Sequence, residues 1–243
     1  MRTLTPRRRI RRREGALRRR LGQIGFDATP RALTEPLRTL VARQELHTGE
    51  PLPRTTVVAS VLPGDDAEIV AHALAALVAH DYERRVCRVD GSWFASLGHE
   101  FRGSDVSADL VDDDQELSGA LWTTPGQPLL ATLRSEPGEP NEPSERCRAA
   151  DVRRLVARLG NEFDHIILEA PGLLANRDGE TIVNESDGYV LVVRRGTSTE
   201  GQVQSAAALA ASTVCLGAVL TDYDRARPRG FNRRVRARGA VPA

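Results

Sequence analysis

Lysine is absent from this sequence: all 34 basic residues among the 243 are arginines. A genome of high G+C content would produce much of this bias, but the chemical consequence is the same. No step that requires a lysine ammonium can occur on this chain, because a guanidinium does not substitute freely for that compact point charge.

Other absences narrow the class of protein. No run of about 18 apolar residues is present, so no segment is expected to span a bilayer, and the first residues lack the apolar stretch of a secretory signal. The cytoplasm is therefore the expected location. Cys87, Cys147 and Cys215 are odd in number and far apart, which fits apolar fillers better than zinc ligands or disulfides. The five histidines show no ligand spacing either, so we expect no metal site held by protein ligands alone.

Positive charge is concentrated at the two ends of the chain. Residues 1–20 carry ten arginines and one glutamate, and residues 225–243 carry seven arginines and no acid. Because the whole chain has a net charge of +1, the stretch between these ends carries −15. The sequence therefore predicts an acidic body between two basic tails, a flexible one at 1–32 and a second at 225–243.

Residues 7–26 place Ile10, Leu17, Leu21 and Ile24 at about helical spacing among arginines. A basic amphipathic helix of this kind can lie on an anionic membrane surface. The same composition can bind nucleic acid non-specifically, or stay disordered and contact the acidic body. The sequence leaves these three hypotheses open.

The rest of the chain alternates between strand and helix patterns. Strand patterns lie at 54–61, 84–90, 164–171, 189–195 and 215–224, and helical patterns lie at 33–46, 67–80, 149–163 and 199–212. Apolar strands separated by amphipathic helices predict an α/β fold, a parallel sheet with helices on both faces. The expected domain is 33–224, with an irregular, acidic and proline-rich insertion at about 91–148.

A phosphate-binding loop is expected in SVLPGDDAEIVAHALA (60–75), between the first strand and its helix. In this setting, backbone N–H groups and the helix dipole point at an anion. The segment resembles the Walker A region of bacterial tyrosine kinases and their MinD/ParA relatives, S-P-x-x-G-E-G-K-S-T-x-x-A-x-x-L-A. The resemblance covers about residues 33–228 and implies a P-loop NTPase fold, a three-layer sandwich.

The phosphate loop lacks the family's ATP-binding side chains. It comprises Pro63, Gly64, Asp65, Asp66, Ala67 and Glu68. Aligned on Pro63 and Gly64, the family's second glycine falls on Asp66, its lysine on Ala67 and its magnesium-binding Ser/Thr on Glu68. Loss of the lysine removes a charge-assisted contact of about 1.5–3 kcal/mol. Three carboxylates are instead expected where a polyphosphate would bind, and like charges repel.

Three further family motifs are altered. In CRVDGSWF (87–94), Asp90 matches the first acid of V-D-A-D-x-R, but the second acid and the arginine are missing. Glu169 replaces the Walker B aspartate in IILEAPG (166–172), and Thr221 replaces the adenine-reading asparagine in LTDYD (220–224). Together these changes imply a site that no longer holds magnesium and ATP. Asp90 fits a turn cap equally well, and Glu169 fits a polar residue at a strand edge.

The resemblance also bears on assembly. Family members form rings beneath a membrane polysaccharide co-polymerase through an E-x-x-R-x-x-R motif, and they phosphorylate a C-terminal tyrosine cluster. Glu35 and Arg38 match the first two motif positions, whereas the third is Val41, so homo-oligomerisation stays open. Residues 230–243 contain no tyrosine, so autophosphorylation in the family's manner is not expected.

The leading hypothesis is a catalytically inactive P-loop kinase homologue without ATP or magnesium as cofactor, peripheral at the inner face of the membrane. It would be a scaffold or regulator of capsule or exopolysaccharide synthesis, docking to a membrane co-polymerase, a transmembrane adaptor or an active kinase paralogue. One alternative is a divergent ATPase or tyrosine kinase that uses Asp90 and Glu169, with an arginine in place of the lysine. Another is a ParA/MinD-like protein that binds DNA or anionic lipid through its arginine tails.

Overall fold

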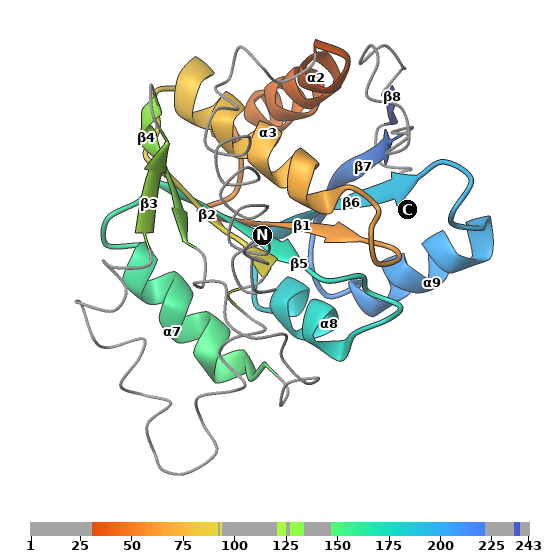
Figure 1. The fold of residues 1–243 in the computed structure, drawn as a ribbon. Coiled ribbons are helices and arrows are strands. Elements are labelled where there is room, and N and C mark those ends of the chain that lie inside the picture. Colours follow the sequence, from red (N-terminus) through yellow and green to blue (C-terminus); the bar gives the residue numbers. More distant parts are fainter. Residues whose placement is uncertain are drawn as a thin grey trace, which may run out of the picture.

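The computed structural model describes residues 31–91, 93, 121–124, 127–133, 147–221 and 236–238 (Figure 1). Its helices are α2 (Arg31–Thr48), α3 (Ala67–Asp81), α7 (Ala149–Leu159), α8 (Arg177–Asn184) and α9 (Glu200–Leu209). Its strands are β1 (Thr55–Ser60), β2 (Val86–Val89), β3 (Leu121–Thr124), β4 (Gln127–Leu133), β5 (His165–Ala170), β6 (Gly188–Arg194), β7 (Cys215–Thr221) and β8 (Arg236–Arg238).

The described strands form one sheet in the order β3-β4-β2-β5-β1-β6-β7-β8. The six strands from β4 to β7 in this order are all parallel, and only the edge strands β3 and β8 run antiparallel to their neighbours. The central strand is β1, paired with β5 on one side and β6 on the other. The predicted α/β fold with a parallel sheet is confirmed.

Helices cover both faces of the sheet (Figure 1): α2 and α3 lie on one face, and α7, α8 and α9 on the other. Successive residues of β1 therefore point into different cores. Val58 packs with α2 and α3, whereas Val57 and Ala59 belong to the core on the opposite face. All six residues of β1 are buried, as expected for a central strand covered on both sides.

The alanine-rich helix α3 is buried along most of its length because it lies between the sheet and α2. Leu37 and Val41 of α2 are in the same core as Val70 and Leu74 of α3. A helix that is apolar on most of its surface must be covered in this way. The packing holds the N-terminus of α3 at the carboxyl end of β1, where the phosphate loop begins.

Three regions of the chain differ from the expectation. The insertion expected to be irregular contains β3 and β4, and β4 joins the parallel part of the sheet beside β2. Helix α8 was not predicted, and residues 236–238 of the C-terminal basic tail pair with β7. The predicted helix at 7–26 and the other tail residues lie outside the described part. In the described part, no helix combines the length and apolar character needed to cross a bilayer.

Candidate functional site

The loop between β1 and α3 retains left-handed backbone positions. Gly64 has φ 86°, and a Cβ there would meet no atom within 4 Å, so glycine is favoured by the backbone angle. Asp66, at the position of the family's second glycine, has φ 60° and ψ 21° and is the N-cap of α3. Aspartate is one of the few residues besides glycine that adopt this region. The loop has therefore kept left-handed turns while losing a glycine.

A second loop, between β5 and α8, packs directly against the phosphate loop. The Leu173 N–H donates to the Ser60 carbonyl at 2.9 Å, and the Leu174 N–H donates to the Val61 carbonyl at 3.2 Å. A Cβ on Gly172 would come within 2.8 Å of the backbone of Leu62 and Pro63. Gly172 thus allows a close approach of two backbones that fixes one wall of the site.

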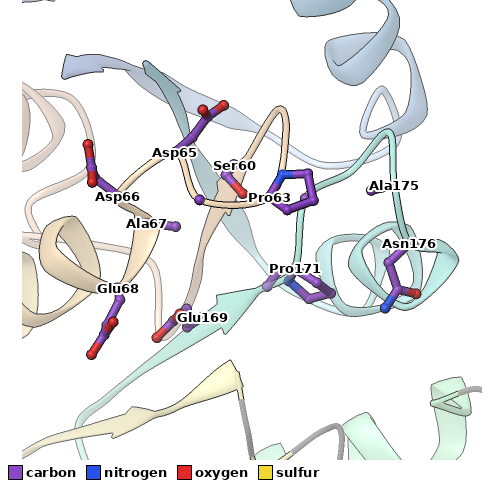
Figure 2. A pocket seen from close by; sticks show the side chains of 13 residues that line it. Ser60, Pro63, Asp65, Asp66, Ala67, Glu68, Glu169, Pro171, Ala175 and Asn176 are labelled. Atoms are coloured by element: carbon purple, nitrogen blue, oxygen red, sulfur yellow. The ribbon is translucent and has the colours of Figure 1, made fainter. Parts of the chain in front are cut away.

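These two loops enclose a cavity of about 510 Å³ (Figure 2). It is lined by residues 63–68 of the phosphate loop, by residues 169–172 and by Ser60, Ala175 and Asn176. The structure therefore brings Glu169 and all six residues of the predicted phosphate loop to one cavity. It does not place Asp90 or Thr221 in the lining. Thr221 is buried at the end of β7, two strands away from β1, where its carbonyl accepts from the Arg195 N–H.

Asp65 is bonded to the protein, contrary to the expectation that all three loop carboxylates lie where a polyphosphate would bind. It accepts hydrogen bonds from the Leu62 N–H and the Thr197 hydroxyl, both at 3.0 Å. Its side chain points away from Glu169 in Figure 2. Asp65 therefore links the phosphate loop to the turn between β6 and α9, and Glu68 and Glu169 lie on the other side of the loop.

Arg88, which belongs to none of the sequence motifs above, joins two of the candidate acids. It is 7% exposed on β2, and its guanidinium lies 3.4 Å from Oδ2 of Asp90 and 3.6 Å from Oε2 of Glu169. Parallel pairing of β2 with β5 places the three side chains at the same end of the sheet. Strand alternation could have predicted the contact with Asp90, because Arg88 and Asp90 are two residues apart and therefore lie on the same face of the sheet.

The pKa of the Glu169 carboxyl is raised from 4.5 to about 7. Burial is the largest cause of the raised pKa, the neighbouring carboxylates of Asp90 and Glu68 act in the same direction, and Arg88 acts against them. A single guanidinium thus offsets only part of the charge of the acids around it. At neutral pH Glu169 is poised between its protonated and ionised forms, as the acidic and basic groups of many active sites are.

Another arginine reaches the backbone of the phosphate loop. Nη1 of Arg194, the last residue of β6, donates to the Gly64 carbonyl at 3.4 Å. Arg54 is bonded to the Gly160 carbonyl, in a different pocket. Neither Arg54 nor Arg195 lines the cavity, so neither takes the place of the missing lysine there.

The residues present do not fit magnesium and ATP. Ala67 offers no cation, Glu68 offers a carboxylate in place of a metal-binding hydroxyl, and Glu169 is engaged by Arg88. In P-loop NTPases the metal is held by the loop Ser/Thr and a Walker B aspartate. No cluster of three or more metal-binding side chains occurs within the described residues.

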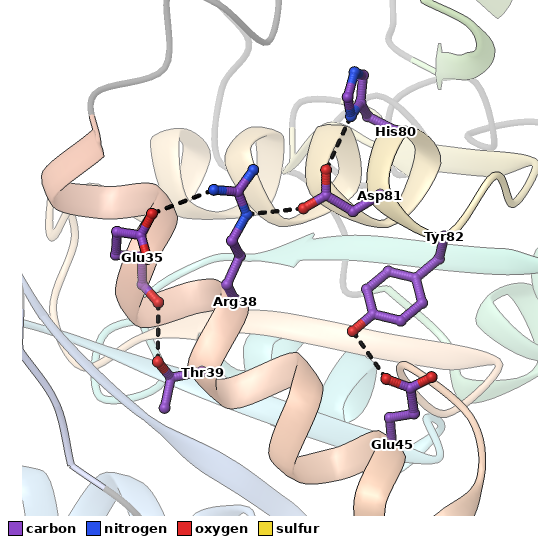
Figure 3. Close-up of polar contacts among 7 residues, drawn as sticks. All are labelled: Glu35, Arg38, Thr39, Glu45, His80, Asp81 and Tyr82. Carbon is purple, nitrogen blue, oxygen red and sulfur yellow. Dashed lines mark hydrogen bonds and ion pairs between the residues drawn. The ribbon is translucent and has the colours of Figure 1, made fainter.

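The predicted oligomerisation pair, Glu35 and Arg38, lies on α2 (Figure 3) and is not part of the cavity lining. Nε of Arg38 donates to Oδ2 of Asp81 at 2.8 Å, and its Nη1 donates to Oε1 of Glu35 at 3.2 Å. Tyr82 likewise donates from α3's C-terminal end to Glu45 of α2 at 3.1 Å. Within this chain, Arg38 therefore links α2 to α3.

Comparisons with known proteins find bacterial tyrosine kinases, both by sequence and by fold. The chain matches no protein-family profile. Over 132 residues, 52% of its length, it is 26% identical to tyrosine-protein kinase ptk of Acinetobacter johnsonii, and the match covers 17% of that protein. The kinase domain of the Escherichia coli tyrosine kinase ETK superposes with a TM-score of 0.60 at 19% identity, over 82% of this chain and 79% of that domain. The VpsO kinase domain gives 0.59 at 17% identity, over 82% and 99%.

The fold is therefore that of bacterial tyrosine kinase domains, and the predicted P-loop NTPase architecture is confirmed. The sequence similarity to a tyrosine kinase agrees with the resemblance found in the motifs. Because the match covers 17% of that kinase, its activity and partners do not carry over to this chain directly.

Proposed function

We propose that this chain is a catalytically inactive P-loop kinase homologue that acts as a scaffold or regulator in capsule or exopolysaccharide synthesis. One observation carries the proposal: the phosphate loop keeps its place and left-handed turns, but its cavity presents carboxylates and an alanine where a nucleotide needs an ammonium. The fold is retained while the chemistry of phosphate binding is not.

Electrostatics supports this interpretation. Glu68 and Glu169 lie near each other in the cavity, and each would repel a phosphate group. Asp65 is bonded within the protein, and Nη1 of Arg194 donates to the Gly64 carbonyl. A triphosphate entering this cavity would meet an excess of negative charge in a partly desolvated site, where repulsion is stronger than in water.

The docking part of the proposal follows from the likeness to bacterial tyrosine kinases. A domain with the fold of these kinases but without their activity could bind another component of the same machinery. The candidate partners are a membrane co-polymerase, a transmembrane adaptor or an active kinase paralogue. Such a partner would bind an outer surface of the fold, and binding would need neither nucleotide nor metal.

Calorimetry with ATP and magnesium tests the absence of nucleotide binding. We expect no saturable heat with the wild-type chain and no release of phosphate. A dissociation constant in the micromolar range, or measurable turnover, would contradict the proposal. A genetic test separates scaffold from enzyme: Asp90→Asn, which keeps an oxygen acceptor for Arg88 but removes the acid, should leave polymer synthesis unchanged in a strain that depends on this chain.

A divergent enzyme is the alternative that one observation favours. Glu169, with a pKa of about 7 beside Asp90, has the protonation behaviour of a general acid or base. This alternative predicts that the wild-type chain turns over a nucleoside triphosphate and that Asp90→Ala abolishes the turnover. Absence of activity with every nucleoside triphosphate would exclude it.

A further inference from the structure

Arg88 is an unusual residue for its position. It lies in β2, on the sheet face covered by α3, where its strand neighbour Val86 and the paired Ile167 belong to the apolar core. Its residue exposure is 7%, and within the described residues neither Nε nor Nη1 has a hydrogen-bond acceptor. Burying a guanidinium costs several kcal/mol unless opposite charges compensate.

The compensation comes from two acids at the carboxyl end of the sheet. Asp90 lies at 3.4 Å and Glu169 at 3.6 Å from the guanidinium, and their side chains are 23% and 18% exposed. Glu169 lines the cavity beside the phosphate loop. The guanidinium is therefore positioned between one acid of the cavity wall and one acid just outside it.

We propose that Arg88 is the resident cation of this cleft, and that it holds Asp90 and Glu169 together in the role that a divalent metal ion has in P-loop NTPases. In those proteins the cation bridges the phosphates and is held by acidic and hydroxyl groups at the ends of the strands. Here the bridging charge is covalently part of the chain, and the distances above are those of direct ion pairs. The cleft is thereby organised without metal.

A resident arginine has two consequences. It repels a second cation from the two carboxylates, so the cleft is closed to magnesium even where acids are present. It also keeps the two strand ends together in the absence of any ligand, so the shape of the cleft does not depend on nucleotide. The inference concerns the same cleft as the proposed function, but its test uses no nucleotide, so either can fail alone.

Metal response of an arginine variant tests the proposal. Thermal unfolding and the electron paramagnetic resonance of Mn²⁺ are followed for the wild-type chain and for Arg88→Gln, without and with millimolar Mg²⁺ or Mn²⁺. We expect no response in the wild type. In Arg88→Gln the two carboxylates lose their cation, so Mn²⁺ should bind at least about tenfold more tightly than to the wild type and raise the melting temperature.

Two controls make the result specific. Arg85→Gln removes an exposed arginine one residue before β2, which pairs with Asp164, and should behave toward metal as the wild type does. Arg88→Gln combined with Glu169→Gln leaves only Asp90 of the two acids that pair with Arg88 and should lose most of the gained affinity.

Each outcome decides the question. If Arg88→Gln unfolds in chelator but folds in Mg²⁺, the metal has replaced the guanidinium and the proposal is supported. If it stays unfolded with metal while the double variant folds, or if it folds but binds no metal, the proposal fails. Metal binding by the wild type at Asp90 and Glu169 overturns it as well.

Discussion

Glu169 shows how the surroundings of one carboxyl group set the pH response of the molecule. Because its pKa rises from 4.5 to about 7 on folding, the folded chain retains a proton that the unfolded chain has lost between these pH values. This contribution to stability is fully present below about pH 4.5 and is lost as the pH rises through about 7, by up to about 3 kcal/mol. Glu169→Gln should remove that dependence. The free energy of unfolding in urea, determined from pH 5 to 8 in steps of about one pH unit, measures this dependence.

The control for this measurement is Glu162→Gln, an exposed carboxylate after α7. It should leave the slope of stability against pH unchanged over the same range. A slope in Glu169→Gln equal to that of the wild type would mean that Glu169 ionises in the folded chain as it does in the unfolded one.

Asp65 contributes to stability in spite of its position in a phosphate loop. Its buried carboxylate accepts from the Leu62 N–H and from the Thr197 hydroxyl. Asp65→Ala leaves the Leu62 N–H without this acceptor, whereas the Thr197 hydroxyl keeps the Arg194 carbonyl at 2.8 Å. We expect a loss of about 2 kcal/mol in the free energy of unfolding. Asp65→Asn, which keeps one carbonyl acceptor, should lose less. Equal losses would show that the hydrogen bonds to Asp65 do not matter.

At the scale of elements, the Arg38–Asp81 pair tests how strongly α2 is tied to α3. The side chains are 43% and 24% exposed, so solvent and salt screen the interaction. A double-mutant cycle with Arg38→Ala and Asp81→Ala should give a coupling energy below about 1 kcal/mol, decreasing in high salt. A larger coupling that is insensitive to salt would mean that the pair is far less hydrated than its exposure indicates.

The helices and strands differ in how well they could be predicted from the sequence. The segment from β1 to α3 was predicted because a β-branched run flanked by prolines and a long alanine-rich helix give strong local patterns. Helix α8 was missed because it has eight residues and buries only Ile182 and Val183 among its apolar side chains. Strand β4 was missed because acidic and proline-rich segments on either side suggested irregular chain, although its own residues are mostly apolar.

The site was predicted in part for a related reason. The phosphate loop and Glu169 lie at strand ends, and the carboxyl ends of parallel strands meet at one edge of a sheet. The role of Arg88 depends on the register of β2 against β5, which brings its guanidinium to Glu169 from 81 residues away in the sequence. Whether the Asp65 side chain points toward Glu169 or away from it depends likewise on a tertiary contact, the hydrogen bond from Thr197. Motif alignment contains neither piece of information.

At the scale of the whole molecule, the segregation of charge leads to a last prediction. The ends of the chain carry nine and seven net positive charges, and the stretch between them carries −15. An acidic body is repelled by an anionic bilayer, so membrane attachment would depend on the arginines at the ends, each worth about 1 kcal/mol near the surface. We expect the full chain to sediment with vesicles containing phosphatidylserine and not with neutral vesicles.

Binding of this kind has a defined salt dependence. It should weaken steeply between about 50 and 200 mM salt, and removal of residues 1–20 should weaken it at every salt concentration. Duplex DNA added as a competitor distinguishes lipid binding from nucleic-acid binding. If the tails prefer nucleic acid, the DNA should displace the chain from the vesicles. If removal of residues 1–20 leaves the affinity unchanged, the acidic body cannot be the reason. The binding would then come from the C-terminal arginines or from an apolar contact, and only binding through an apolar contact would persist at high salt.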